Sequence, residues 1–193
     1  MKNINKKKIL ICIFFSLFLI SEKLVAEENW KIDKNLSEIE MKLQIFPGDD
    51  ILIDFRKFDG LLSYENNIFK SKLIVSLNIS SIDFENLELK NFLLQDSFFY
   101  IKKFPIILFE VEDFDLKNED YQSLIKINDI NRLVKSDIYV SELTKDLIHF
   151  KIENTISRKN FNLSVKNNID FLTDQKSILM DKIIIKMNLF FVK

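Results

Sequence analysis

Apolar and polar residues alternate along much of the chain, which is the pattern of a β-strand with one buried face. From Glu38 to Ile45 every second residue is apolar, and the residues between them are charged or carry an amide. Successive side chains of a strand point to opposite faces, so such a segment buries one side of a sheet and leaves the other in water. The apolar positions of five alternating segments are Ile39, Met41, Leu43 and Ile45; Leu73, Val75, Leu77 and Ile79; Ile107, Phe109 and Val111; Ile148, Phe150, Ile152 and Ile156; and Ile183, Ile185, Met187, Leu189 and Phe191. The chain is therefore predicted to be all-β, with antiparallel strands.

Polar stretches rich in turn-forming residues separate these segments, for example Pro47-Gly48-Asp49-Asp50. Antiparallel strands that each have one apolar face must pack those faces together, either as a β-sandwich or as a β-barrel. The alternation is the same in both architectures, so the pattern alone does not choose between them.

One segment, at about residues 83–96, breaks the alternation and is predicted to be a short helix between two strands. Asp83 is the expected N-cap, because its carboxylate can accept hydrogen bonds from the free N–H groups of the first turn. Pro105 lacks an N–H group and restricts the residue before it, so the next strand is expected to begin after it. The apolar residues whose spacing places them on one helix face are Phe84, Leu87, Leu94 and Phe98.

The first 26 residues have the composition of a secretory signal peptide, and the folded domain is expected to span residues 27–193. Four lysines among the first eight residues precede an apolar run from Ile9 to Ile20, and Ala26 is a small residue suited to cleavage. A helix that spans a membrane needs about 20 apolar residues, so this run is short for a span. We expect export to the periplasm with no integral membrane span after removal of the signal; an uncleaved anchor is the alternative.

Removal of the predicted signal changes the charge of the chain. The whole chain has 28 Lys and Arg against 29 Asp and Glu, and the domain that remains has 23 against 28, a net charge of −5. A mildly acidic domain without a basic cluster is poorly suited to nucleic acid, and no nucleic-acid partner is expected. The only cysteine, Cys12, lies within the predicted signal, which excludes disulfides and thiolate chemistry from the domain.

No set of residues has the spacing of a catalytic or metal-binding motif, so a non-enzymatic protein without a metal or cofactor is predicted. His149 is the only histidine, and it lies on the strand face opposite Phe150, where we expect it to be solvated. A single outward imidazole forms neither a metal site nor a catalytic triad. Arg158 shares the parity of the apolar residues before it. It is predicted either to bind a polar group of a ligand, or to bind backbone carbonyls or Asp33 or Asp59 if the strand ends at Ser157.

Several short stretches, which occur in a fixed order along the chain, carry a family resemblance. They are Trp30-Lys31-Ile32-Asp33 with Ser37, residues 55–65 around Phe58-Asp59-Gly60, Ser80-Ser81-Ile82, Asp96-Ser97-Phe98-Phe99 with the run from Lys103 to Phe109, and the run from Ile156 to Leu163. Together they resemble the YceI-like family of lipocalin-like, polyisoprenoid-binding proteins. Leu36 and Phe92 stand where members often carry His, and Gln95-Asp96-Ser97 replaces a Ser-x-Asp triplet. These departures argue against a polar or metal-binding role at those positions.

The resemblance implies an extended antiparallel barrel of about eight strands, a size whose interior can hold one small ligand. It also implies the ligand, a long-chain isoprenoid or a quinone-like lipid. Aromatic residues gather at the predicted helix and its exit, and an aromatic lid suits a long apolar ligand. By strand parity and position, the residues predicted to line the cavity are Met41, Leu43, Val75, Leu77, Phe92, Phe98, Phe109, Val111, Phe150, Ile152 and Met187.

Two alternatives remain open at this stage. A structural or interaction barrel of the cell envelope would have the same alternation but a solid interior without a lipid. An enzyme acting on a lipid is a further alternative, although no nucleophile–base pair supports it. The residues do not decide between a monomer and a homodimer.

Overall fold

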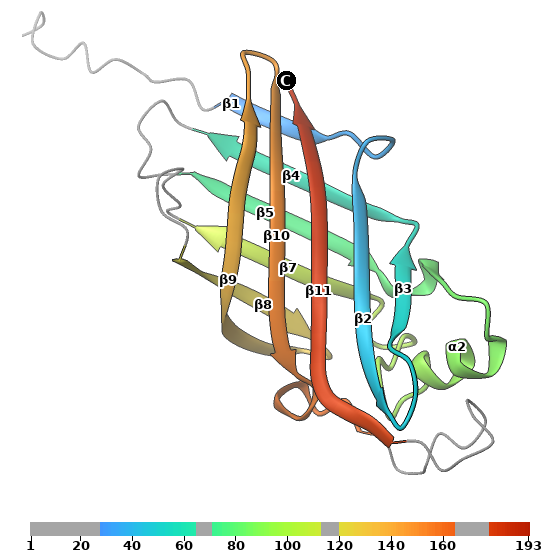
Figure 1. The fold of residues 1–193 in the computed structure, drawn as a ribbon. Coiled ribbons are helices and arrows are strands. Elements are labelled where there is room, and N and C mark those ends of the chain that lie inside the picture. Colours follow the sequence, from blue (N-terminus) through green and yellow to red (C-terminus); the bar gives the residue numbers. More distant parts are fainter. Residues whose placement is uncertain (1–27, 65–70, 113–119, 165–177) are drawn as a thin grey trace, which may run out of the picture.

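Strands that are far apart in the sequence close into a ring in the computed structural model, which describes residues 28–64, 71–112, 120–164 and 178–193 (Figure 1). All pairs in the ring are antiparallel, and the last strand pairs with the first through Lys31–Val192 and Ile32–Phe191. In pairing order the ring contains β1 (Glu28–Ile32), β4 (Phe58–Tyr64), β5 (Lys72–Asn78), β7 (Ile106–Glu112), β8 (Asp120–Ile127), β9 (Ile130–Leu143), β10 (Leu147–Ser157) and β11 (Ile178–Val192). The prediction of an all-β, eight-stranded antiparallel barrel is confirmed.

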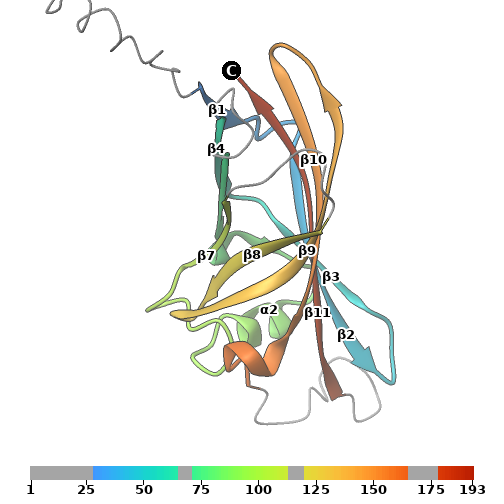
Figure 2. The same ribbon diagram turned by 90° about the vertical axis from the view of Figure 1, so that its left-hand side faces the viewer.

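Three further strands extend the sheet beyond the ring. They are β2 (Glu38–Phe46), β3 (Ile51–Phe55) and β6 (Ile82–Asp83), and they follow β11 in the order β11–β2–β3–β6. The long strand β11 serves both parts, because its segment from Ile178 to Asn188 pairs with β2 and its last residues pair with β1. Figure 2 shows β4 and β7 in one wall, β10, β11 and β2 in the facing wall, and α2 at the end away from the C-terminus.

The apolar residues of the alternating segments are buried, and they lie on the strand faces that point into the space between these walls. In β2 and β5 buried and more exposed residues alternate along the whole strand. The predicted apolar positions of all five segments are buried and belong to a single hydrophobic core. The parity of these strands was therefore predicted correctly from the sequence.

The helix is shorter than predicted and begins later. Helix α2 spans Leu87–Leu93, and its N-cap is Asn86, whose Oδ1 accepts a hydrogen bond of 3.0 Å from the N–H of Leu89. Asp83 does not cap it, because that residue is still part of β6 and pairs with Asp54 of β3. The predicted helix face is wrong as well: Leu87 is 69% exposed, and the buried positions of α2 are Leu89 and Leu93.

The connection from α2 to β7 is made of turns that bury two aromatic rings. Phe98 and Phe99 are fully buried and meet edge to face, with 4.8 Å between ring centroids. The chain then turns at Tyr100, which has a φ of 44°. Strand β7 begins directly after Pro105, as predicted from the missing N–H of that residue.

Two short 3₁₀ turns complete the described elements, η2 (Ile79–Ser81) after β5 and η3 (Arg158–Phe161) after β10. The predicted signal peptide, residues 1–26, lies outside the described residues. Within the described ranges, no helix is long and apolar enough to cross a membrane.

Candidate functional site

The residues predicted to line a cavity are brought together between the two walls of the barrel. Their backbones lie on β2, β5, β7, β10 and β11, on α2, and on the turn that follows α2. Phe92 of α2 is half-buried and packs against the core. The other ten, none of them more than 3% exposed, are Met41, Leu43, Val75, Leu77, Phe98, Phe109, Val111, Phe150, Ile152 and Met187. Contact of any of them with a ligand stays a prediction.

Pairing between strands places several of these residues directly beside one another. Val75 of β5 lies opposite Phe109 of β7 in one wall. In the facing wall, Ile152 of β10 lies opposite Met187 of β11. An apolar tail between these walls would meet only aliphatic, aromatic and thioether surface at these positions.

The barrel is filled with side chains at the level of Gly60 on β4. A Cβ atom at Gly60 would lie only 3.2 Å from Cβ and Cδ1 of Ile32 and from Cζ of Phe191. The ring of Phe191 in turn meets that of Phe150 edge to face, with 5.9 Å between ring centroids. We call this region, defined by Gly60, Ile32, Phe150 and Phe191, the packed end.

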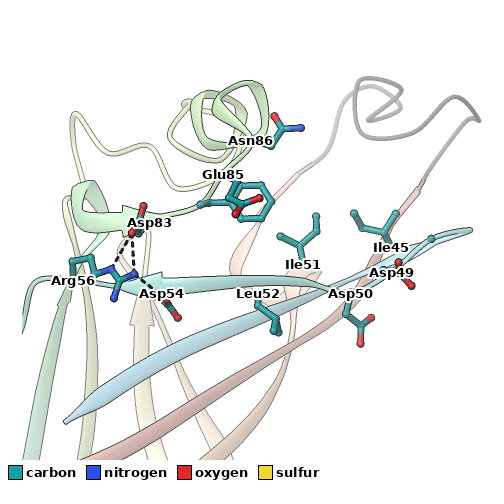
Figure 3. Close-up of a pocket in the computed structure, with 12 residues that line it drawn as sticks. Ile45, Asp49, Asp50, Ile51, Leu52, Asp54, Arg56, Asp83, Glu85 and Asn86 are labelled. Atoms are coloured by element: carbon teal, nitrogen blue, oxygen red, sulfur yellow. Dashed lines mark hydrogen bonds and ion pairs between the residues drawn. The ribbon is translucent and has the colours of Figure 1, made fainter. Parts of the chain in front are cut away.

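A cavity of about 730 Å³ opens between the β2–β3 hairpin and the segment that leads from β6 into α2 (Figure 3). We call it the mouth; it is lined by residues 45, 48–52, 54 and 56 of the hairpin region and by residues 83–86. In Figure 3, Ile45 and Ile51 point toward the side of the hairpin where Glu85 and Asn86 lie, while Leu52 and Asp54 point away. Ile45 and Ile51 also belong to the hydrophobic core, so the mouth and the core share apolar side chains.

The rim of the mouth is acidic. Its described lining residues include the carboxylates of Asp49, Asp50, Asp54, Asp83 and Glu85 and a single guanidinium, that of Arg56, although Asp54 points away from the side where Glu85 lies (Figure 3). Arg56 lies 2.9 Å from a carboxylate oxygen of Asp83 and 3.3 Å from one of Asp54. These side chains are mostly exposed, so each ion pair adds little to stability. The excess of negative charge disfavours the approach of an anionic group.

Lys42 of β2 lies beside the mouth, because it pairs with Leu52, one of the lining residues. Its ammonium group forms an ion pair with Asp50, and this contact raises the pKa of Lys42 above its usual value. Lys42 therefore stays charged; Asp50 is its main partner, and the carboxylates of Glu40 and Glu153 also raise its pKa.

Three polar side chains that sequence reasoning missed meet inside the barrel. Ser123 of β8, Ser136 of β9 and Asn154 of β10 are all fully buried. The hydroxyls of Ser123 and Ser136 are hydrogen bonded, and Nδ2 of Asn154 donates to Oγ of Ser136. The sequence did indicate one of them: Asn154 is two residues from both Ile152 and Ile156, so a regular strand points its side chain to the same buried face.

Arg158 lies just beyond the end of β10, which terminates at Ser157. Its Nη1 donates to the backbone carbonyl of Leu163, and its Nε lies 3.4 Å from the carbonyl oxygen of Met180. Both contacts are of the structural kind considered from the sequence.

Asp181 of β11 binds the residues on both sides of Arg158, at the junction of β10 and η3. Its carboxylate accepts hydrogen bonds from the Ser157 hydroxyl at 2.7 Å and from the backbone N–H of Lys159 at 3.0 Å. These bonds, that of Ser157 first, hold the pKa of Asp181 below its ordinary value.

His149 has the predicted parity, but the expectation that it is solvated is wrong. The residue is only 9% exposed, and its ring stacks on that of Phe190, with 4.0 Å between centroids and 4° between planes. Its Nε2 also lies 2.5 Å from Oδ1 of Asn188. The reason is that a neighbouring strand supplies an aromatic ring on the outer face, which strand parity does not reveal.

In the part of the chain that the structure describes, no group of three or more His, Cys, Asp or Glu residues is arranged to hold a metal ion.

Together, the closed antiparallel barrel and its apolar interior define a lipocalin-like fold. A family model described as the YceI-like domain matches residues 30–191, and the chain belongs to this family. Among curated proteins, none matches this sequence significantly.

Solved structures with the same fold have low sequence identity to this chain. BcnA of Burkholderia cenocepacia is 14% identical, with a TM-score of 0.68 over 82% of this chain and 98% of that one. A polyisoprenoid-binding domain from Saccharophagus degradans is 12% identical, with a TM-score of 0.64 over 84% and 97% of the two chains. A Campylobacter jejuni YceI protein is 21% identical, with a TM-score of 0.55 over 74% and 87%. At these identities the likeness concerns the fold.

Proposed function

We propose that this protein binds a long-chain isoprenoid or quinone-like lipid, with the tail in the apolar interior of the barrel. The observation that carries the proposal is the continuity of the hydrophobic core with the mouth, through Ile45 and Ile51. The family supports it, since one neighbour of the same fold is described as a polyisoprenoid-binding domain.

The energetics of such binding come from burial of the tail. Each methylene group that leaves water contributes about 0.8 kcal/mol, so a tail needs no charged contact to bind tightly. The acidic rim adds a restriction on the head group, because a phosphate would meet the carboxylates of Asp49 and Glu85. A neutral head group fits this mouth better than an anionic one.

We propose binding rather than catalysis as the role of this interior. The chain has a single imidazole, that of His149, and its ring lies on the outer face against Phe190. Ser123 and Ser136 are therefore not placed beside a histidine base, which serine nucleophiles commonly use.

We further propose that the protein acts in the periplasm after export and removal of residues 1–26. The basic start and the short apolar run of this segment support the proposal. N-terminal sequencing of protein recovered from the periplasmic fraction should find Glu27 first, whereas the full-length chain in the membrane fraction would mean an anchor.

Native mass spectrometry of the purified protein, with and without lipid extraction, tests lipid binding. A mass that disappears on extraction and matches an isoprenoid is the expected result. The matched variants are Leu43→Trp, which places a large ring on the inward face of β2 beside Ile51 of the mouth, and Gln44→Trp, which places it on the opposite face of the same strand. Leu43→Trp should fold and lose the lipid, because the indole occupies the space of the tail, and Gln44→Trp should keep it.

The opposite outcome would favour a solid structural barrel. In that case the wild type carries no lipid, and Leu43→Trp overpacks a dense core. The free energy of unfolding would then fall by about 1–3 kcal/mol or more in Leu43→Trp.

A further inference from the structure

The buried polar cluster of Ser123, Ser136 and Asn154 faces the interior of the barrel. Asn154 lies between Ile152 and Ile156 on the buried face of β10, and its neighbours along the strand, Glu153 and Thr155, are exposed. All three cluster residues are fully buried, on three adjacent strands of one wall. The cluster is thus a polar patch on the inward face of this wall, with Ile152 and Ile156 on either side of Asn154 along β10.

The hydrogen bonds of this cluster leave one acceptor unused. Nδ2 of Asn154 donates to Oγ of Ser136, and the two serine hydroxyls bond to each other. Oδ1 of Asn154 is buried and accepts no hydrogen bond in the described structure. A buried polar atom without a partner is unfavourable, and a leucine of similar size would avoid it. A donor from outside the chain would satisfy this oxygen.

Strand register relates the row of Asn154 to the row of residues at the mouth. Asn154 pairs with Ile185, which pairs with Met41, which pairs with Ile53 of β3. Ile51, which lines the mouth, is two residues before Ile53 on the same strand. The row of Asn154 is therefore one step, about 7 Å along a strand, from the row of Ile51, and Asn154 lies three strand spacings, about 14 Å, across the sheet from β3.

We propose that Oδ1 of Asn154 accepts a hydrogen bond from a hydroxyl of the bound lipid, so that the barrel selects isoprenoids that carry an alcohol or a phenol. The inference rests on the proposed function and names the ligand class of the same interior. A hydroxyl supplies the missing proton, whereas an ether or a carbonyl oxygen has none to give. A phosphate is excluded on two counts, because it would face this acceptor and the acidic rim.

Binding of two probes that differ only in the donor tests the proposal. The probes are a C20 prenol and its methyl ether, and the measured quantity is the Kd of each by isothermal titration calorimetry. The wild type should prefer the prenol by about tenfold, the effect of one buried hydrogen bond. Asn154→Leu should bind both probes equally. Thr155→Leu, which changes the next residue on the outer face of the same strand, should keep the preference.

Four outcomes would overturn the inference. Equal affinity of the wild type for both probes would remove it and leave lipid binding intact, and so would a preference that survives in Asn154→Leu. Failure of both probes to bind the wild type would remove the proposed function and the inference with it. If Asn154→Leu does not fold, Asn154→Ala serves in its place, and the wild-type comparison needs no variant. A crystal structure of the prenol complex must show the ligand hydroxyl, and not a water molecule, on Oδ1.

Discussion

Gly60 shows how a single missing side chain matters at the packed end. Its inward position on β4 is occupied by side chains from two other strands, Ile32 of β1 and Phe191 of β11. A methyl group added to Gly60 would lie 3.2 Å from three atoms of these side chains, which is closer than ordinary van der Waals contact. Glycine is therefore needed here for space, since β1 and β11 close the ring at this level.

Gly60→Ala is expected to lower the free energy of unfolding by about 1–2 kcal/mol, because the added methyl group overpacks Ile32 and Phe191. Ile32→Val removes Cδ1, one of the three close atoms, and alone should cost about 0.5–1.5 kcal/mol. Urea unfolding of both single variants and the double variant measures their coupling. The double variant should be more stable than the sum of the single effects, by about 0.5 kcal/mol or more. Strict additivity would show that the Ile32 side chain does not limit the space at Gly60.

At the scale of elements, α2 illustrates how a local signal is overruled by pairing. Asp83 and Asn86 are both suitable N-caps by residue type. The backbone of Asp83 is engaged with Asp54 in the sheet, so only Asn86 is free to begin the helix. The carboxylate of Asp83 pairs instead with Arg56 at the rim of the mouth.

Asn86→Ala should lower the free energy of unfolding by about 1 kcal/mol, because the N–H of Leu89 loses its acceptor. Asp83→Asn serves as the control, since it removes an exposed ion pair without touching the cap. Its effect should be smaller and should vanish at high salt, where the pair with Arg56 is screened. Denaturant unfolding at low and at high salt measures both. If Asp83→Asn lowered the free energy of unfolding more than Asn86→Ala does, the assignment of Asn86 as the N-cap would be wrong.

At the scale of the whole molecule, β11 joins the ring to the three additional strands. It pairs with β10 along eleven residues and also with β2 and β1. By contrast, β6 is held in the sheet by two residue pairs with β3 alone. The central strand β11 and the short strand β6 therefore differ greatly in how many residue pairs hold them in the sheet, whereas β2 is secured by eight pairs with β11.

Native-state hydrogen exchange should resolve this difference. Amides in the centre of β11, such as that of Ile185, should exchange only through global unfolding, whereas those of β6 should exchange through local opening. Strand β5 is the control, because it pairs with β4 and β7 on both sides and should behave like β11. Exchange followed by NMR in increasing denaturant measures the opening free energies. Equal values for β6 and β11 would mean that β6 unfolds only together with the rest of the barrel.

What the sequence determined by itself was the set of residues that face inward. The period-2 pattern needs only the geometry of a strand, so Met41, Val75, Phe109 and Ile152 could be assigned to the interior without knowledge of their partners. The family resemblance then supplied the barrel, which the pattern had left open against a sandwich.

Only the tertiary structure decided which chain segments meet, because those contacts join residues distant in sequence. It placed Phe190 over His149, moved the helix cap from Asp83 to Asn86, and brought Ile32 and Phe191 against Gly60. It also gathered Ser123, Ser136 and Asn154 from three strands into one hydrogen-bonded cluster. Asn154 broke the apolar parity in the sequence, but only the positions of the described residues around it show that none of them donates a hydrogen bond to its Oδ1.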